Sequence, residues 1–189
     1  MADNRDNRRD NRRDGRRPEI QEEKQFDERV VHIDRVARVV KGGRRFRFRA
    51  LVVVGDHKGK VGIGIAKGAD VTAAVAKAVD VAKKNFFTIK LHNGTIPHES
   101  EAKVSGARIL IKPAAPGTGL IAGGVVRTVL EVAGVSNVLS KSLGSSNKIN
   151  TAYATLAALQ SIVPADKWLT REVAAAAKKT AKAEKVEAK

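Results

Sequence analysis

The chain has 189 residues, a formal net charge of +16 at pH 7 and a pI of about 10.4. Such a charge attracts polyanions, which makes nucleic acid the first partner class to consider and an anionic membrane surface the second. Without cysteine there can be no disulfide or thiolate metal site, and without an apolar N-terminal segment or a long apolar run we expect a soluble, cytoplasmic protein with no secretory signal and no membrane span.

The N-terminal segment repeats four residues of mixed charge, DNRRDNRRDGRR from Asp6 to Arg17. It holds no apolar residue and cannot bury enough surface to offset its ordering entropy. We therefore expect residues 1–24 to form a disordered tail. The excess positive charge lies in residues 25–89, which carry 14 basic and 6 acidic side chains.

Three strands are predicted next, over 29–40, 45–54 and 61–66. They are rich in β-branched residues or alternate apolar residues with glycine, and glycine turns at 41–44 and 55–59 separate them. Asp70 is a good helix N-cap, and apolar residues at helical spacing follow it to Ala82. Residues 25–89 are thus expected to form a three-stranded antiparallel sheet covered on one face by a helix.

The second strand places alternate side chains on opposite faces of that sheet. One face is apolar throughout and should pack on the core, so the two phenylalanines should anchor the strand to its own helix. The other face is cationic and then apolar, and its apolar half is expected beneath the second domain. The first face holds Phe46, Phe48, Ala50, Val52 and Val54, and the second holds Arg45, Arg47, Arg49, Leu51 and Val53.

A second domain is expected over 90–164. Residues 88–112 suggest two strands broken near Asn93-Gly94 and around Pro97. The segment PAAPGTGLIAGG leads into an apolar helix with Gly134 as its C′ glycine. A short strand near 135–139 and a helix to Ile162 follow. Residues 165–189, dominated by alanine and lysine, should be a helical or frayed tail.

Two glycine-rich segments resemble nucleotide-binding loops. GIGIAKG, 62–68, has lysine where GxGxxG needs its last glycine, which favours glycines that let a sheet pack closely. PGTGLIAGG is more suggestive, because amides at a glycine-rich helix start attract phosphate. Its order of elements is similar to the galactose, homoserine and mevalonate kinase superfamily, but Ile121 and Ala122 replace that loop's serines, which favours a closely packed helix start. Spacing among the four histidines, His32, His57, His92 and His98, indicates neither a metal site nor catalysis.

Two longer stretches, VVKGGRRFRFRALVVVGDHKGKVGIGIAKG and KPAAPGTGLIAGGVVRTVLEVAGVSNVLSKSLGSSNKIN, closely resemble the bacterial small-subunit ribosomal protein S5 family. The resemblance covers about residues 25–165 and implies an α+β protein. The first domain would be like a double-stranded-RNA-binding domain, and the second would be a two-layer βαβ-type domain with a left-handed crossover.

The same resemblance implies a structural, non-enzymatic constituent of the small subunit that binds ribosomal RNA and supports assembly and decoding accuracy. It implies contacts with ribosomal proteins S4 and S8, messenger RNA nearby, no cofactor, and spectinomycin resistance arising in the loop matching 40–44. The protein contact would lie along Gly117, Thr118, Gly119 and Arg127. Charge and resemblance together predict RNA binding by Lys41, Gly42, Gly43, Arg44, Arg45, Arg47, Arg49, Lys58, Lys60 and Lys67.

The segment before the predicted helix departs from ordinary double-stranded-RNA-binding domains, because Lys67 is followed by Gly68-Ala69-Asp70 rather than by a lysine pair. This departure argues against docking across two minor grooves and favours the loops and sheet edge as the RNA surface. Two alternatives remain open, a nucleotide-dependent small-molecule kinase using PGTGLIAGG and a free-standing RNA chaperone.

Overall fold

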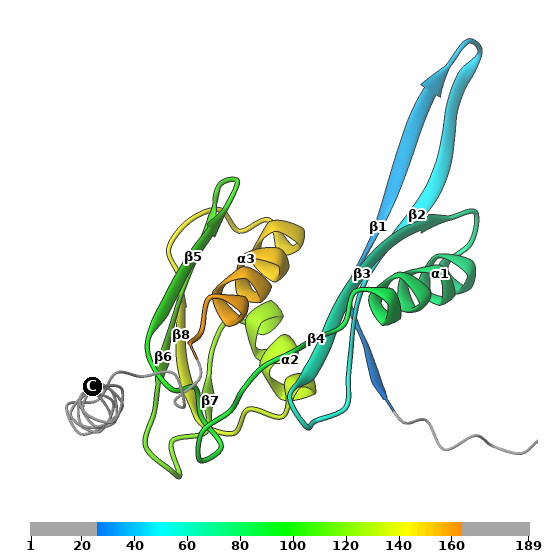
Figure 1. Cartoon of the computed structure of the whole chain (residues 1–189). Coiled ribbons are helices and arrows are strands. Elements are labelled where there is room, and N and C mark those ends of the chain that lie inside the picture. Colours follow the sequence, from blue (N-terminus) through cyan, green and yellow to red (C-terminus); the bar gives the residue numbers. More distant parts are fainter. Residues whose placement is uncertain (1–25, 164–189) are drawn as a thin grey trace, which may run out of the picture.

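The computed structural model describes residues 26–163, so the two predicted tails lie outside the described residues. Figure 1 shows four layers, in which a pair of helices is held between two sheets and a third helix covers the outer face of one sheet. This arrangement confirms the α+β class. No helix within residues 26–163 is both long and apolar enough to cross a membrane.

The first sheet has the order β1-β2-β3-β4, with all neighbours antiparallel. Its strands are β1 (Asp27–Val40), β2 (Gly43–Gly55), β3 (Lys60–Gly68) and the two-residue β4 (Phe87–Thr88). The sequence predicted the first three and missed β4. Helix α1 (Val71–Lys84) follows Asp70, whose carboxylate accepts a hydrogen bond of 2.7 Å from the Thr72 hydroxyl.

Glycines in β3 allow α1 to lie close against the sheet. A Cβ added at Gly64 would lie 1.9 Å from the Ala78 carbonyl oxygen, and one at Gly62 would lie 2.4 Å from that of Ala82. Both alanines are fully buried on the sheet-facing side of α1. The close-packing interpretation of GIGIAKG is therefore confirmed, because any side chain at these positions would push the helix away.

The second sheet has the order β5-β6-β8-β7. Its strands are β5 (Ser100–Val104), β6 (Ala107–Pro113), β7 (Leu120–Ile121) and β8 (Val138–Ser142), and its helices are α2 (Gly124–Ala133) and α3 (Lys148–Gln160). Strands β7 and β8 are parallel and joined through α2, which gives the predicted βαβ unit. Gly134 ends α2 in the left-handed conformation with φ of 84°, as predicted.

Element boundaries in this second half differ from the prediction. The strand pair turns at Ser105-Gly106, whereas Asn93-Gly94 makes a tight turn closed by a bridge between His92 and Thr95. The later strand begins at Val138 rather than near 135, and α3 ends at Gln160 rather than Ile162. An Asn-Gly pair specifies a turn, but it does not specify whether long strands flank that turn.

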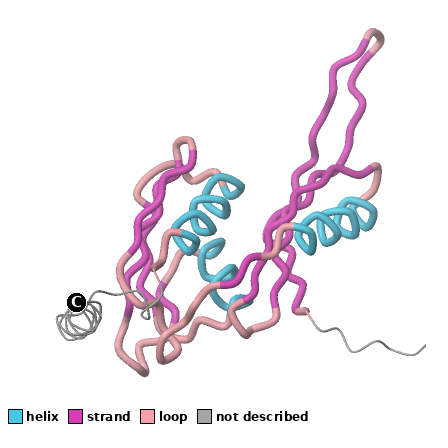
Figure 2. Tube along the Cα trace, viewed as in Figure 1, coloured by secondary structure: helices cyan, strands magenta, loops and turns pink. Residues whose placement is uncertain are grey.

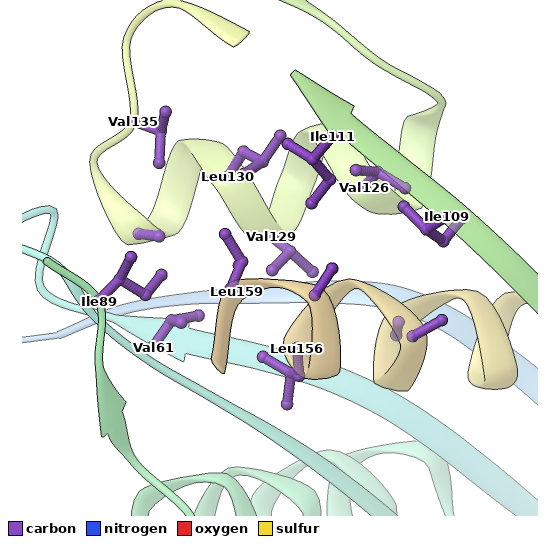
Figure 3. Close-up of a cluster of buried hydrophobic side chains, with 14 of the residues drawn as sticks. Val61, Ile89, Ile109, Ile111, Val126, Val129, Leu130, Val135, Leu156 and Leu159 are labelled. Carbon is purple, nitrogen blue, oxygen red and sulfur yellow. The ribbon is translucent and has the colours of Figure 1, made fainter. Parts of the chain in front are cut away.

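One apolar core is shared by both halves of the chain. Figure 3 shows Val61 and Ile89 meeting residues of α2 and α3, among them Val129 and Leu159. Leu51 and Val53 belong to the same core, so the expectation that they lie beneath the second domain is confirmed. The alternate residues of β2 instead pack against α1 in a separate cluster that includes Ala50, Val52 and Val54.

The two phenylalanines of β2 have different environments. Phe48 is partly buried and packs on the cluster beneath α1, as expected. Phe46 is 49% exposed, so the prediction that it anchors the strand to α1 is wrong. The reason is the length of the neighbouring strand, because β3 ends at Gly68 opposite Phe48 and leaves Phe46 beyond the third strand.

The joint between the two halves is formed by the β2–β3 turn and the C-terminus of α2. The amides of His57 and Gly59 donate to the carbonyl oxygens of Val132 (3.1 Å) and Ala133 (2.9 Å). These carbonyls have no partner within an α-helix, so the turn acts as their cap. The His57 ring also bonds the Glu131 carbonyl (2.8 Å) and the Asp27 carboxylate (3.1 Å), which ties β1 to the joint.

The joint predicts a large cost for a side chain at Gly134. An added Cβ would lie 2.0 Å from the His57 carbonyl oxygen, at a φ of +84° that L residues rarely adopt. Gly134→Ala should therefore lower the free energy of unfolding, measured by urea titration of the full chain, through both strain and overpacking. Gly117→Ala is the matched control, because Gly117 has φ of +92° with no atom within 4 Å.

The control should cost about 1–2 kcal/mol from strain alone. Gly134→Ala should cost about 1–3 kcal/mol more than the control because of the overpacking. Equal losses for the two variants would show that the close approach at the joint contributes nothing.

Candidate RNA interface

The first two strands extend as a lone hairpin beyond the rest of the molecule (Figure 2). Their pairing continues outward from Arg35 opposite Phe48 to Val40 opposite Gly43, past the end of β3. The turn at Lys41-Gly42 needs glycine, since Gly42 and Gly43 have φ of 93° and 143°. The tip therefore projects both faces of a two-stranded ribbon away from the core.

One face of this ribbon is cationic, and we call it the arginine face. It holds Arg45, Arg47 and Arg49 on β2, Arg38 opposite Arg45 on β1, and Lys67 opposite Arg49 on β3. Most of these side chains line a shallow pocket of about 320 Å³ in which no acidic residue takes part. Its lining is Val36, Ala37, Arg38, Val40, Arg45, Arg47 and Lys67.

The charges of the arginine face oppose one another across the strands. Arg38 and Arg45 are direct cross-strand partners, an arrangement that destabilises a hairpin when both residues carry the same charge. Within residues 26–163, no ion pair to an acid is found for Arg38, Arg45, Arg47 or Lys67. An anion in the pocket would relieve this repulsion, and its hydrogen bonds to guanidinium groups would be charge-assisted.

Arg49 differs from its neighbours because it is already paired. Its guanidinium donates to the Asp34 carboxylate from Nη2 (2.7 Å) and Nε (3.1 Å). The other Asp34 oxygen lies 2.8 Å from His32 Nε2, and Lys148 Nζ at the start of α3 lies 3.1 Å from His32 Nδ1. A lysine ammonium can only donate, so Nδ1 accepts and Nε2 carries the proton given to Asp34.

This chain of bonds fixes the charge of Asp34. The hydrogen bond from Arg49 holds the pKa of the Asp34 carboxyl below its usual range, against an opposing effect of burial and with further help from His32. Arg49 is thus a neutralised part of the arginine face. Its bonds also connect the base of the hairpin to α3 in the second domain.

The predicted RNA-binding residues fall into two groups. Residues 41–49 and Lys67 lie together on or beside the hairpin, with Arg44 on the face opposite Arg45. Lys58 and Lys60 lie at the other end of the sheet, where Lys60 is about 23 Å along β3 from Lys67 by strand rise. There they are near the joint, and their amides donate to the Asp56 carboxylate at 2.8 and 2.9 Å. Burial raises the pKa of the Asp56 carboxyl, but these two bonds together with the charge of Lys60 lower it below its usual range.

Sequence reasoning missed Arg35 and Arg38, which lie on opposite faces of β1 near the tip. Arg38 completes the arginine face, whereas the guanidinium of Arg35 lies 3.9 Å from the centroid of the Phe46 ring. The available signal was their position in a predicted strand that must pair with Arg45 and its neighbours across a short turn. If the Gly-Gly turn is interpreted as the turn of a β-hairpin, both arginines lie beside the predicted RNA-binding residues of the second strand.

The predicted protein-contact residues lie on the second domain. Gly117 and Gly119 donate their amides to the Asn137 side-chain oxygen at 3.1 and 3.0 Å. Thr118 is exposed between them, and the exposed Arg127 on α2 pairs with Glu131 at 2.9 Å. No atom lies within 4 Å of a Cβ added at Gly117, Gly119, Gly123 or Gly124, so the expectation of a closely packed helix start is wrong. The first two glycines instead supply positive φ.

Part of the glycine loop of the second domain is already occupied by hydrogen bonds within the protein. Two of its amides, those of Gly117 and Gly119, are already bonded to Asn137. Within residues 26–163, no group of three or more histidine, aspartate or glutamate side chains is placed to hold a metal ion. The chemistry that the described residues support is anion binding by fixed cations.

Comparison with known proteins gives matches over both halves of the chain. The family described as "Ribosomal protein S5, N-terminal domain" matches residues 26–90, and "Ribosomal protein S5, C-terminal domain" matches residues 102–176. Among curated proteins, the chain is similar to the "Small ribosomal subunit protein uS5" of Treponema pallidum subsp. pallidum. The two are 51% identical over 150 residues, which is 79% of this chain and 87% of that protein.

The Asp34–Arg49 pair predicts a specific titration behaviour. Arg49→Gln removes the main donor, so the pKa of Asp34 should rise toward its ordinary value in a carboxyl-carbon NMR titration. Asp70 is the control, because its lowered pKa comes mainly from the Thr72 hydroxyl, and it should not move.

The stability effect of this pair has a definite sign. A lowered folded pKa contributes stability above the ordinary aspartate pKa, and that contribution is lost as the pH falls through the lowered value. Arg49→Gln should therefore reduce stability near neutral pH while leaving it little changed in strong acid. An unmoved Asp34 titration would show that the pair does not persist in solution.

Proposed function

The chain belongs to the ribosomal protein S5 family, and we propose that the arginine face of its hairpin is the main surface by which it holds ribosomal RNA. Membership of this family makes the protein a structural constituent of the small ribosomal subunit. In that role it binds ribosomal RNA and other ribosomal proteins in the cytoplasm. We propose no catalytic activity for it.

The observation that carries the proposal is the pocket of four cations without an acid. Arg38, Arg45, Arg47 and Lys67 converge there on a projecting ribbon. Phosphate groups of RNA match the charge of these donors, and neutralising the phosphates releases counterions. Lys41 at the turn and Arg44, on the other face of the ribbon, add positive charge near the tip.

Finer contacts are proposals of the same kind. We propose that the exposed loop at 117–119, together with Arg127, meets ribosomal protein S4, and that the hairpin turn lies near the spectinomycin site. Contact with S8, proximity to messenger RNA and a contribution to decoding accuracy follow from the family resemblance. The exposure of Thr118 and Arg127 supports the first of these contacts.

The two alternative functions make different predictions. A kinase needs amides and metal ligands around its nucleotide loop, whereas two amides of this loop are bonded to Asn137. Labelled ATP should therefore show no micromolar binding. A free-standing chaperone would sediment mainly outside ribosomes on a sucrose gradient, whereas a subunit protein sediments with them.

The arginine face predicts a change in the salt dependence of RNA binding. The double variant Arg45→Gln/Arg47→Gln removes two cations without removing buried volume. The slope of log affinity against log salt for small-subunit ribosomal RNA should therefore become shallower by about two. Arg49→Gln should change the slope less, because Asp34 already neutralises Arg49.

A matched control removes two charges elsewhere. Lys103→Gln/Lys141→Gln changes two exposed lysines on the second sheet, on the side away from α2 and α3, and should leave the slope nearly unchanged. Melting temperatures should stay close to that of the wild type in both double variants. If the two variants alter the slope equally, the hairpin has no special role.

A further inference from the structure

The second face of the hairpin differs in chemistry from the arginine face. It carries Arg35, Ala37 and Val39 on β1 and Arg44 and Phe46 on β2. Phe46 is 49% exposed and Val39 is 77% exposed, although both are large apolar side chains. Neither belongs to a core cluster of the described residues. This is an exposed aromatic ring on a strongly basic ribbon.

The Phe46 ring has a defined neighbour rather than a random setting. The Arg35 guanidinium carbon lies 3.9 Å from the ring centroid, which is the geometry of a cation–π contact. The residue directly opposite Phe46 is Ala37, whose small side chain leaves the flank of the ring open. Together the guanidinium and the ring form a stacked unit at the surface.

The aromatic ring contributes little to the fold at this place. The third strand ends opposite Phe48, and the buried residues of α1 begin at Ala74 and lie over the inner part of the sheet. At such an exposed strand position, replacing the ring by another β-forming residue should cost little stability. The ring therefore serves contact with a partner better than it serves packing.

We propose that Phe46, stacked with Arg35, is a platform for one unpaired base of ribosomal RNA. The proposal rests on the RNA-binding role of the hairpin and specifies how its second face is used. Recognition of RNA by proteins uses unstacked bases that lie on aromatic rings or guanidinium planes. A paired base has both faces covered within the helix, so the ligand is a nucleotide in a loop, bulge or single strand.

The two faces of the hairpin bind different parts of the nucleotide. Phosphates bind the cations of the arginine face, and the base lies on Phe46 on the opposite face. Beyond Phe48, no strand among residues 26–163 pairs with β2 on the side where β3 has ended, so a nucleotide strand can pass from one face to the other. The hairpin would thus recognise RNA at a place where the strand is locally unpaired.

The test separates stacking from charge by using probes with and without bases. The full chain is titrated with a 12-residue oligouridylate and with an abasic oligonucleotide that has the same number of phosphates. Wild type should bind the base-bearing probe more tightly by roughly five- to 150-fold, the range for one base on an aromatic ring. Phe46→Leu keeps an apolar side chain but removes the ring, so this preference should fall toward one.

Two control variants define the result. Phe46→Trp should retain the preference, and Val39→Ala, which changes an exposed apolar residue on the same face, should not alter it. The salt slope should be the same for Phe46→Leu and wild type, because no cation is lost. A preference that survives in Phe46→Leu, or an equal loss of affinity for both probes, would overturn the proposal.

The effect of Phe46→Leu can also be measured in the assembled small subunit by chemical probing of its ribosomal RNA. Small subunits reconstituted with Phe46→Leu should show one or a few ribosomal RNA bases with raised reactivity toward reagents that modify unstacked bases. The ribose footprint around the hairpin should stay unchanged. A base-reactivity pattern identical to that of wild type would count against stacking. By contrast, an unchanged salt slope in Arg45→Gln/Arg47→Gln would contradict phosphate binding by the arginine face, and it would not bear on base stacking by Phe46.

Discussion

Two backbone hydrogen bonds, from the amides of His57 and Gly59 to the last carbonyl oxygens of α2, connect the two halves of this protein. A helix that ends at a buried surface needs partners for these carbonyls, and here another domain supplies them. The contact requires backbone to approach backbone, which is why Gly55 and Gly134 face atoms less than 3 Å from where a Cβ would lie. The common core, from Leu51 on β2 to Leu159 on α3, depends on this joint.

Strand β2 has different roles along its length. Its inner half is buried on both faces, with Leu51 and Val53 toward α2 and α3 and with Ala50 and Val52 toward α1. Its outer half projects beyond the core, and the arginines there lie on the same face of the strand as Leu51. One continuous strand therefore connects the joint to the tip.

Alternation along β2 was sufficient to predict which residues face each neighbour, because a strand has a fixed period of two. The same alternation could not locate the end of β3, and so it misplaced Phe46 in the core. The Arg49–Asp34 pair depends on the cross-strand register, which runs without a shift from Val40 opposite Gly43 and is therefore set by the exact residues of the turn. Likewise, the bonds of Asn137 to the glycine loop join positions 18 and 20 residues apart, which no local pattern specifies.

Because one continuous strand joins the joint to the tip, a rotation at the joint is magnified at the tip. From Gly55 to Gly43 the strand spans about 40 Å, so a rotation of roughly 10° at the joint would displace the tip by about 7 Å. That displacement exceeds the length of a hydrogen bond more than twofold. The accuracy with which the tip meets its target is therefore set by backbone packing at the opposite end of the molecule. Small structural changes around Gly134 would therefore displace the hairpin tip, although Gly134 makes no contact with it.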